Sequence, residues 1–234
     1  MANVRLLYNY DAWDAGSISE SSDIAKRRGG NILLDQPGKS WVTTGDTGQW
    51  IVNDLGTNKK LTCFGIFNHN LSSTATITLE GNALDIWTSP TYSQALTIAT
   101  NADGTVFPRL VYFLDETHRF FRLTIEDGSN PDGRIEIGRI IAGEYYEFTR
   151  QPARGLRVAH ADPSSIEHTG GTIENFDDLE ERNRYRQFRV DLPWRDVTER
   201  RKIEAIYTKV GNVRPVVLAL DPTNYPSELS AYCY

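Results

Sequence analysis

Methionine and cysteine are nearly missing from this chain of 234 residues, which holds one methionine, Met1, and two cysteines, Cys63 and Cys233. With 39% hydrophobic and 11% aromatic residues, this profile favours an aromatic-rich β protein over a helical bundle. The sequence allows a disulfide between the two cysteines, but nothing in their spacing demands one. Because Cys63 lies inside an apolar run, we expect a buried free thiol there.

An excess of positive charge and long apolar runs are also lacking. The formal net charge is -6 and the isoelectric point is near 5.3, which argues against a protein that wraps nucleic acid or binds membranes through a polybasic surface. No apolar segment reaches the roughly 18 residues of a membrane span, and Met1 to Leu7 does not resemble a signal peptide. We therefore expect no nucleic-acid partner, no membrane insertion, and a protein that leaves the cytoplasm, if at all, without the secretory route.

Complete catalytic, cofactor and metal motifs are absent as well. Gly38-Lys39-Ser40 resembles part of a phosphate loop, but Leu33 stands where that loop needs a glycine. The segment from Asp127 to Gly133 carries the carboxylates of a calcium loop, but Pro131 replaces an oxygen-bearing residue, which favours a simple turn. No HExxH, Cys-x-x-Cys or Gly-x-Ser-x-Gly motif occurs, so we predict no catalytic, cofactor-binding or metal-binding residues and no enzyme. The histidines are too widely separated for a local metal pair: His69, His118, His160 and His168.

What is present is organised around the stretch from Gln49 to Leu71. Two apolar runs, Trp50 to Leu55 and Leu61 to Leu71, flank residues 56–60. This short segment is rich in turn-forming residues and cannot hold a crossover helix, which predicts two antiparallel strands joined by a turn.

The first of these strands alternates so that Trp50 and Val52 lie on one face and Ile51 and Leu55 on the other. Both faces are apolar, as expected of an inner strand of a β-sandwich. We therefore place Trp50 in the core and expect its replacement by alanine to cost about 3–5 kcal/mol of stability.

Short apolar segments separated by Gly, Asn and Pro turns continue to residue 148, and none has the periodicity of a long helix. They predict a mainly β fold with an antiparallel β-sandwich over residues 1–148. Residues 149–234 form a second part, a polar arm followed by a small strand-helix-strand α+β unit. Further strands are expected over residues 4–10, 75–80, 107–114, 119–126, 134–142, 186–192 and 213–220.

The helix of the second part is expected over residues 197–210. Asp196, three residues before Glu199, has capping-box spacing, and Gly211 suits the position after the last turn. The apolar stripe expected to be buried consists of Val197, Ile203, Ile206, Tyr207 and Val210.

The polar arm contains acidic residues that run directly into arginines. The simpler interpretation is solvated surface with local ion pairs. The alternative is an arm that lies across a neighbouring subunit. The residues concerned are Glu174, Asp177, Asp178, Glu180, Glu181, Arg182, Arg184, Arg186 and Arg189, preceded by Gly170-Gly171.

Aromatic residues in the loop-rich middle of the chain are the candidate binding residues. Trp87, Tyr92 and Tyr112 lie in or near this region, and ring faces with a few polar groups are typical of carbohydrate sites. The simpler interpretation is that these rings pack beneath a long loop.

A set of segments, taken in order, resembles the discoidin-like (F5/8 type C, galactose-binding-like) β-sandwich over roughly residues 15–145. The Trp-Ile-x-x-Asp-Leu-Gly element at residues 50–56 is the most specific of them. The chain lacks the cysteine pair that clamps the sandwich ends in secreted members, which fits an intracellular origin. The matching segments are Ser21-Ser22, Leu33-Leu34-Asp35, Ser40-Trp41, Gln49 to Gly56 and Phe64-Gly65-Ile66.

A second resemblance is to structural proteins of tailed bacteriophages, in particular tail-tip or baseplate components. It implies a virion structural protein in the tail, assembled in the host cytoplasm, that docks other tail proteins and forms a homo-oligomeric ring. The alternative is a receptor- or carbohydrate-binding module that contacts a host glycan through Trp87 or Tyr92. The segments that carry this resemblance are Ile66 to Leu71, Asn130 to Gly133, Glu136 to Arg139 and Arg189 to Pro193.

Overall fold

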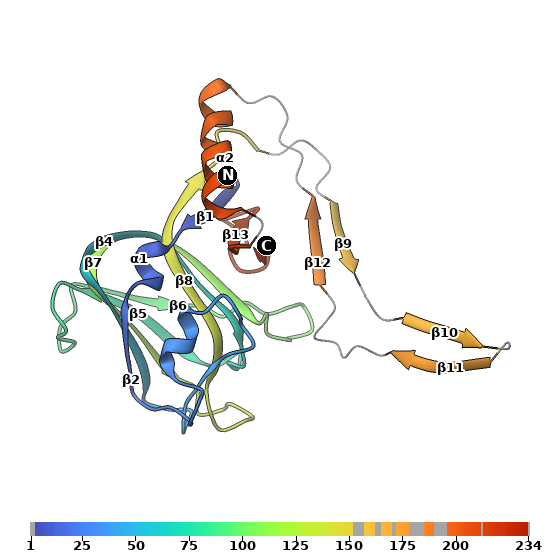
Figure 1. Ribbon diagram of the computed structural model, residues 1–234. Coiled ribbons are helices and arrows are strands. Elements are labelled where there is room, and N and C mark those ends of the chain that lie inside the picture. The colour runs from blue at the N-terminus through green and yellow to red at the C-terminus, as the bar shows by residue number, and fades with distance from the viewer. Residues whose placement is uncertain are drawn as a thin grey trace. The chain divides into compact units, whose positions relative to one another are not determined.

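The computed structural model describes residues 3–151, 157–161, 165–169, 172–177, 185–189, 196–211 and 213–233. The chain divides into two compact units, residues 1–149 with residues 202–234, and residues 150–201. It therefore leaves the first unit after residue 149 and returns to it at residue 202 (Figure 1).

Antiparallel strands dominate both units. The second unit holds β9 (Arg157–Ala161), β10 (Ser165–Thr169), β11 (Thr172–Asp177) and β12 (Tyr185–Arg189), and helix α2 (Val197–Val210) begins in it and ends in the first unit. The other elements of the first unit are β1 (Arg5–Asn9), α1 (Asp11–Asp14), β2 (Ser17–Glu20), the 3-10 helix η1 (Gly29–Leu33), β3 (Trp41–Val42), β4 (Gln49–His69), β5 (Thr76–Asn82), β6 (Tyr92–Leu96), β7 (Arg109–Glu126), β8 (Glu136–Glu147), β13 (Val216–Ala219) and β14 (Ser230–Cys233).

Two long, bent strands, β4 and β7, take part in both layers of the first unit (Figure 1). Residues 49–54 of β4 pair with β7 on one side, and residues 51–54 pair with β2 on the other, whereas residues 63–69 lie between β7 and β8. The first layer has the order β2-β4-β7-β5-β6, and the second has the order β7-β4-β8-β1-β13-β14. The predicted mainly β, antiparallel sandwich with a small helical part later in the chain is confirmed.

The predicted turn over residues 56–60 is wrong. Strand β4 runs through this segment without reversing, and its residues 59–61 pair with residues 116–118 of β7. Gly56 has a φ of 73°, and the pairing register shifts around it, so this glycine bends the strand as a bulge does.

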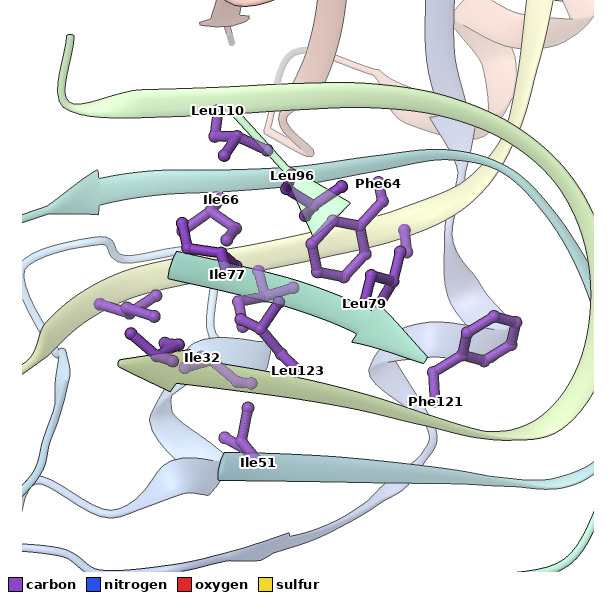
Figure 2. Packing of buried hydrophobic residues seen from close by; sticks show 14 of the residues in the cluster. Ile32, Ile51, Phe64, Ile66, Ile77, Leu79, Leu96, Leu110, Phe121 and Leu123 are labelled. Carbon is purple, nitrogen blue, oxygen red and sulfur yellow. The ribbon is translucent and has the colours of Figure 1, made fainter. Parts of the chain in front are cut away.

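Side chains from both layers meet in one hydrophobic core (Figure 2). Ile51, Leu79 and Leu123 come from the first layer, Phe64 and Ile66 come from the second, and none of the five is more than 3% exposed. Burial of each such side chain contributes about 1.5–3 kcal/mol, so this core is the main source of stability for the sandwich.

The tryptophans of this core are Trp13 and Trp41, and the prediction that Trp50 belongs to it is wrong. Trp41 is 0% and Trp13 is 3% exposed, and each indole N–H donates to a buried or half-buried backbone carbonyl, at 2.9 and 3.1 Å. Trp50 is partly exposed, because side chains alternate along β4 and Ile51 is the one that faces the core.

A second, smaller cluster covers the outer face of the second layer, where Cys63 and Phe67 alternate with core residues of β4. The C-terminal segment packs here. Strand β13 pairs with β1, the Ser227 hydroxyl accepts the Val111 N–H at 3.0 Å, and the Tyr232 ring centroid lies 5.2 Å from that of Phe67. Residues 202–234 thus belong to the same unit as the sandwich, whereas the sequence led us to expect residues 149–234 as one separate part.

Both cysteines are free, so the disulfide that the sequence allows between them does not form in this structure. Cys63 is 1% exposed within the second cluster, and burial raises the pKa of its thiol. The predicted buried free thiol at Cys63 is confirmed.

Helix α2 begins and ends where its capping residues predict. The Asp196 carboxylate accepts the backbone N–H of Glu199 at 2.7 Å. Gly211 has a φ of 61°, and its N–H donates to the Tyr207 carbonyl at 2.7 Å. With 14 residues this is the longest described helix, and none of the described helices is long and apolar enough to span a membrane.

The stripe predicted for α2 is only partly correct. Ile206 is buried, whereas Val197 and Tyr207 are 61% and 62% exposed. Val197 falls off the stripe because six residues of helix rotation leave it about 120° away from position 203.

The described strands of the second unit form two two-stranded antiparallel sheets, β9 with β12 and β10 with β11 (Figure 1). Several residues named from the sequence lie outside the described residues, namely Gly170-Gly171, residues 178–184 of the mixed-charge segment, and residues 190–192 of an expected strand. The interpretation of that segment as ion-paired surface stays a prediction.

Candidate functional site

A loop over residues 83–91, between β5 and β6, carries the first candidate residue, Trp87. The side chain of Asn82 orders this loop: its amide donates to the Ile86 carbonyl at 2.7 Å, and its oxygen accepts from the Ala83 N–H and the Thr91 hydroxyl, both at 2.9 Å. One asparagine at the end of β5 therefore holds both ends of the loop.

Trp87 itself is fixed by three charged residues. Its indole N–H donates to Asp85 at 2.6 Å, and the guanidinium carbon of Arg122 lies 4.6 Å from the ring centroid. Arg122 in turn donates to Glu80 at 2.6 Å across the β5–β7 pair. We call this group, Trp87, Arg122, Glu80 and Asp85, the Trp87 platform. Its ring is partly exposed and its orientation is fixed.

The platform stands on the outer face of the first layer, the face directed away from the core. Arg122 lies opposite Val52 of β4 in the strand register, and Trp50 is the next outward residue along β4. A second ion pair lies on the same layer, where Arg119 donates to both oxygens of Asp54, at 2.7 and 2.8 Å. These hydrogen bonds hold the pKa of Asp54 below its usual value.

Tyr92 and Tyr112, the other two candidates, are not part of this platform. Tyr92 pairs with Gly81 and belongs to the inward alternation of β6, and its ring stacks on His118 with 6.2 Å between centroids. Burial, followed by the neighbouring Tyr112, raises the pKa of Tyr92. For these two rings the interpretation as packing residues fits better than that as an exposed binding surface.

A small cavity lies between the layers, lined by residues such as Ile51, Phe64 and Leu79. Its volume is about 10 Å³, enough for roughly one water molecule. Asn53 lines it and donates to the Trp13 carbonyl at 2.9 Å. This cavity therefore holds no ligand larger than a water molecule.

The described residues contain no group of three or more His, Cys, Asp or Glu side chains that could hold a metal ion. The carboxylate of Asp127, in the segment compared with a calcium loop, accepts hydrogen bonds from the backbone of Ser72 and the side chain of Asn130, both at 2.9 Å. Such donors occupy the oxygens that a cation would need, which agrees with the simple turn.

His69 gives the stability of the protein a dependence on pH. It is 8% exposed, and burial lowers its pKa to about 4. The unfolded chain takes up this proton near pH 6.5 and the folded protein does so only near pH 4, so stability present above pH 6.5 is lost as the pH falls, by up to about 3 kcal/mol. Urea denaturation at successive pH values should show this loss in the wild type and a flatter profile in His69→Gln. If the free energy of unfolding falls equally steeply with pH in both proteins, His69 is not the source of this pH dependence.

The sequence identified Trp87 but missed Arg122, Glu80, Asp85 and Asn82. Alternation along residues 119–126 already separates Arg122 from the core residues, so its outward direction was readable. The register that sets Arg122 beside Glu80, and the loop that brings Trp87 over it, have no local signal in the sequence.

No protein-family model matches the chain, and no curated protein matches its sequence. Among solved structures, the chain is similar to a Streptococcus pneumoniae fucose binding module, SpX-3, with 12% identity, a TM-score of 0.46 and coverage of 60% of this chain and 100% of that one. It is also similar to the lectin domain of lectinolysin complexed with Lewis B antigen, with 12% identity, a TM-score of 0.44 and coverage of 56% and 94%. A third is the CBM32 of AlyQ in complex with 4,5-unsaturated mannuronic acid, with 18% identity, a TM-score of 0.42 and coverage of 58% and 96%.

Proposed function

We propose that this protein is a carbohydrate-binding module and that the Trp87 platform is its binding site. The observation that supports this most is the fixed, partly exposed indole of Trp87, with Arg122 against its ring and Asp85 at its edge. An indole offers a flat apolar surface to the C–H face of a sugar, and adjacent charged groups can bond the hydroxyls.

The loop over residues 83–91 is already ordered, and this also favours ligand binding at the platform. Asn82 closes residues 83–91 through three hydrogen bonds within the protein itself. A ligand that meets an already ordered ring does not have to supply the free energy of ordering it. Leu84 and Ile86 of the same loop are 61% and 54% exposed and enlarge the apolar surface beside the ring.

The geometry favours binding without bond cleavage. Glu80 is paired with Arg122, and Asp85 accepts a hydrogen bond from Trp87. Both carboxylates are thus engaged within the protein, whereas glycoside hydrolysis needs a carboxyl group that is free to pass a proton to the glycosidic oxygen.

Replacing Trp87 by alanine should weaken glycan binding about 10- to 100-fold, because an aromatic anchor at the centre of a contact contributes about 1.4–2.8 kcal/mol. The measurement is affinity electrophoresis against a panel of soluble polysaccharides, followed by calorimetry with the best binder. Trp87→Phe should retain part of the affinity, since a smaller ring still stacks.

Tyr225→Ala is the matched control, because Tyr225 is an exposed aromatic residue, at 48%, outside the outer face of the first layer. It should bind like the wild type. The proposal fails if the wild type binds no polysaccharide of the panel, or if Trp87→Ala and Tyr225→Ala behave alike.

A second candidate function is that of a docking protein in a phage tail, favoured by the build of residues 150–201. The described strands of this unit pair only with each other, in two two-stranded sheets. A two-stranded sheet is marginally stable on its own in water, so an arm built in this way gains most from packing against a neighbouring subunit.

Hydrogen exchange tests this docking role. In the purified monomer, the amides of β9 to β12 should exchange much faster than those of β4, and assembly into particles should protect them. The β4 amides, which form an inner strand, are the internal control. Equal protection of β9 to β12 before and after assembly would contradict docking through this unit.

A further inference from the structure

Trp50 is the one large aromatic residue of β4 that the core does not use. It is partly exposed on the outer face of the first layer. Its backbone N–H is held by the Ser21 hydroxyl at 3.0 Å, whereas its indole N–H has no hydrogen-bond partner among the described residues. A partly exposed indole with a free donor is suited to stack on a ligand and to bond it.

The strand register places Trp50 beside the Trp87 platform. Val52 lies directly opposite Arg122, and Trp50 lies two residues further along β4, about 7 Å along the strand. Trp50 is thus a diagonal neighbour of Arg122, the residue on which Trp87 stacks. Two tryptophans therefore flank one arginine on the same face of the sheet.

Small side chains form the floor beside them. Trp50 pairs with Thr124 of β7, and Thr124 pairs with Thr78 of β5. Ala95 of β6 pairs with Thr78 and completes the row. Both threonines are partly exposed and Ala95 is exposed, and the threonine hydroxyl oxygens can accept hydrogen bonds from the hydroxyls of a neutral sugar.

Charge on this face disfavours an acidic ligand. Arg122 is paired with Glu80, and Arg119 is paired with Asp54. Among the described residues no cation pairs with Asp85, whose carboxylate accepts the Trp87 indole N–H. The chain as a whole carries a formal charge of -6, so both local and overall charge repel uronic acids and sulfated sugars.

From this arrangement we infer that the ligand is an extended, non-acidic polysaccharide chain that lies across the outer face, with one sugar on Trp87 and a further sugar on Trp50. This inference deepens the carbohydrate-binding role proposed above and rests on it. It makes Trp50 a residue that selects for chain length, since a single sugar reaches only one of the two rings.

The experiment is calorimetric titration with neutral cello-oligosaccharides, cationic glucosamine oligomers and acidic oligogalacturonates, each as disaccharide and hexasaccharide. In the wild type, a hexasaccharide of a neutral or amino sugar should bind at least about tenfold more tightly than its disaccharide. Trp50→Ala should bring this ratio close to one, and Trp50→Phe should restore part of it. Trp87→Ala should weaken binding of both lengths.

The outcomes separate the inference from the function on which it rests. If Trp87→Ala weakens binding but Trp50→Ala keeps the wild-type ratio, the extended-chain inference is overturned and the binding module stands. Preferential binding of oligogalacturonates also overturns the inference. If no oligosaccharide or polysaccharide binds, the proposed function itself fails. Far-UV circular dichroism of Trp50→Ala should match the wild type, because Trp50 lies outside the core.

Discussion

Replacing Trp41 by alanine is expected to lower the free energy of unfolding by about 3–5 kcal/mol. Trp41 is 0% exposed and is the largest fully buried side chain of the protein's described part. The change leaves a cavity between the layers and removes the indole N–H that bonds the Ser22 carbonyl at 2.9 Å. The cavity and the lost hydrogen bond each add to the transfer free energy that is lost with the buried indole.

Trp50→Ala is the matched control for this measurement, because it deletes the same side chain from a partly exposed position. It should cost only about 1 kcal/mol. Urea denaturation followed by far-UV circular dichroism suits the comparison, since tryptophan fluorescence differs between the variants. A larger loss for Trp50→Ala than for Trp41→Ala would mean that the core is assigned to the wrong face of β4.

Alternation in the sequence was sufficient to separate the two faces of several strands, but not to decide which face is buried. Trp50 and Val52 face one way and Ile51 the other, as the pattern predicts. Trp50 is large and apolar, so local reasoning assigns it to the core. The partner strand β7 and the second layer decide otherwise, and both lie far along the chain.

The turn predicted over residues 56–60 fails for a related reason. A glycine between two apolar runs is equally compatible with a reversal and with a bend in one long strand. Here β7 offers a continuous partner on both sides of Gly56. Pairing with β7 extends across the bend, which a hairpin of β4 with itself would exclude.

Trp13 shows the limit of periodicity in a short element. Helix α1 has four residues, Asp11–Asp14, too few for any pattern to appear. Its tryptophan is nevertheless buried, because the ring packs edge-on against Phe64 of the second layer with 5.8 Å between centroids. Only the assembled layers reveal this contact.

The sequence predicted one residue of the candidate site, Trp87, but not the side chains that surround it. Trp87, Tyr92 and Tyr112 were considered together because they lie in one loop-rich region. The register of β5 with β6 turns Tyr92 toward His118 and leaves Trp87 on the outer face. Strand pairing decides which polar side chains lie next to a given ring. A single sequence does not specify this pairing.

Arg139 is the second position where a large effect is expected, because a full charge is buried there. It is 0% exposed, donates to both oxygens of Asp14 at 2.8 and 2.9 Å, and donates to the Ile32 carbonyl at 2.9 Å. Asp35 lies at 3.5 Å from the same guanidinium. One side chain of β8 thus ties α1, η1 and the segment after η1 to the second layer.

Arg139→Met should lower the free energy of unfolding by about 3–5 kcal/mol, because it leaves the Asp14 carboxylate and the Ile32 carbonyl without their donor. The matched control is Arg119→Met, which breaks a bidentate pair with Asp54 where the arginine side chain is 42% exposed. That surface pair should cost less than about 1 kcal/mol. Denaturation of the two variants in parallel measures the difference that burial makes.

The pH dependence of the Arg139→Met penalty distinguishes a lost charge partner from lost packing. Burial raises the pKa of Asp14 to about 6, and the Arg139 guanidinium opposes that rise. Without the guanidinium the pKa of Asp14 rises further, so near pH 5 the folded state of both proteins holds this carboxyl group largely protonated. Above pH 6 the wild type ionises it while the variant still has to keep it protonated, so the penalty of the substitution grows from there up to the higher pKa. The penalty should therefore be larger at neutral pH than near pH 5, and Asp14→Asn in the Arg139→Met background should remove the difference. If Arg139→Met loses the same free energy of unfolding at both pH values, the loss comes from packing and not from the missing charge. If this loss is no larger than that of Arg119→Met, the buried pair contributes no more than a surface pair does.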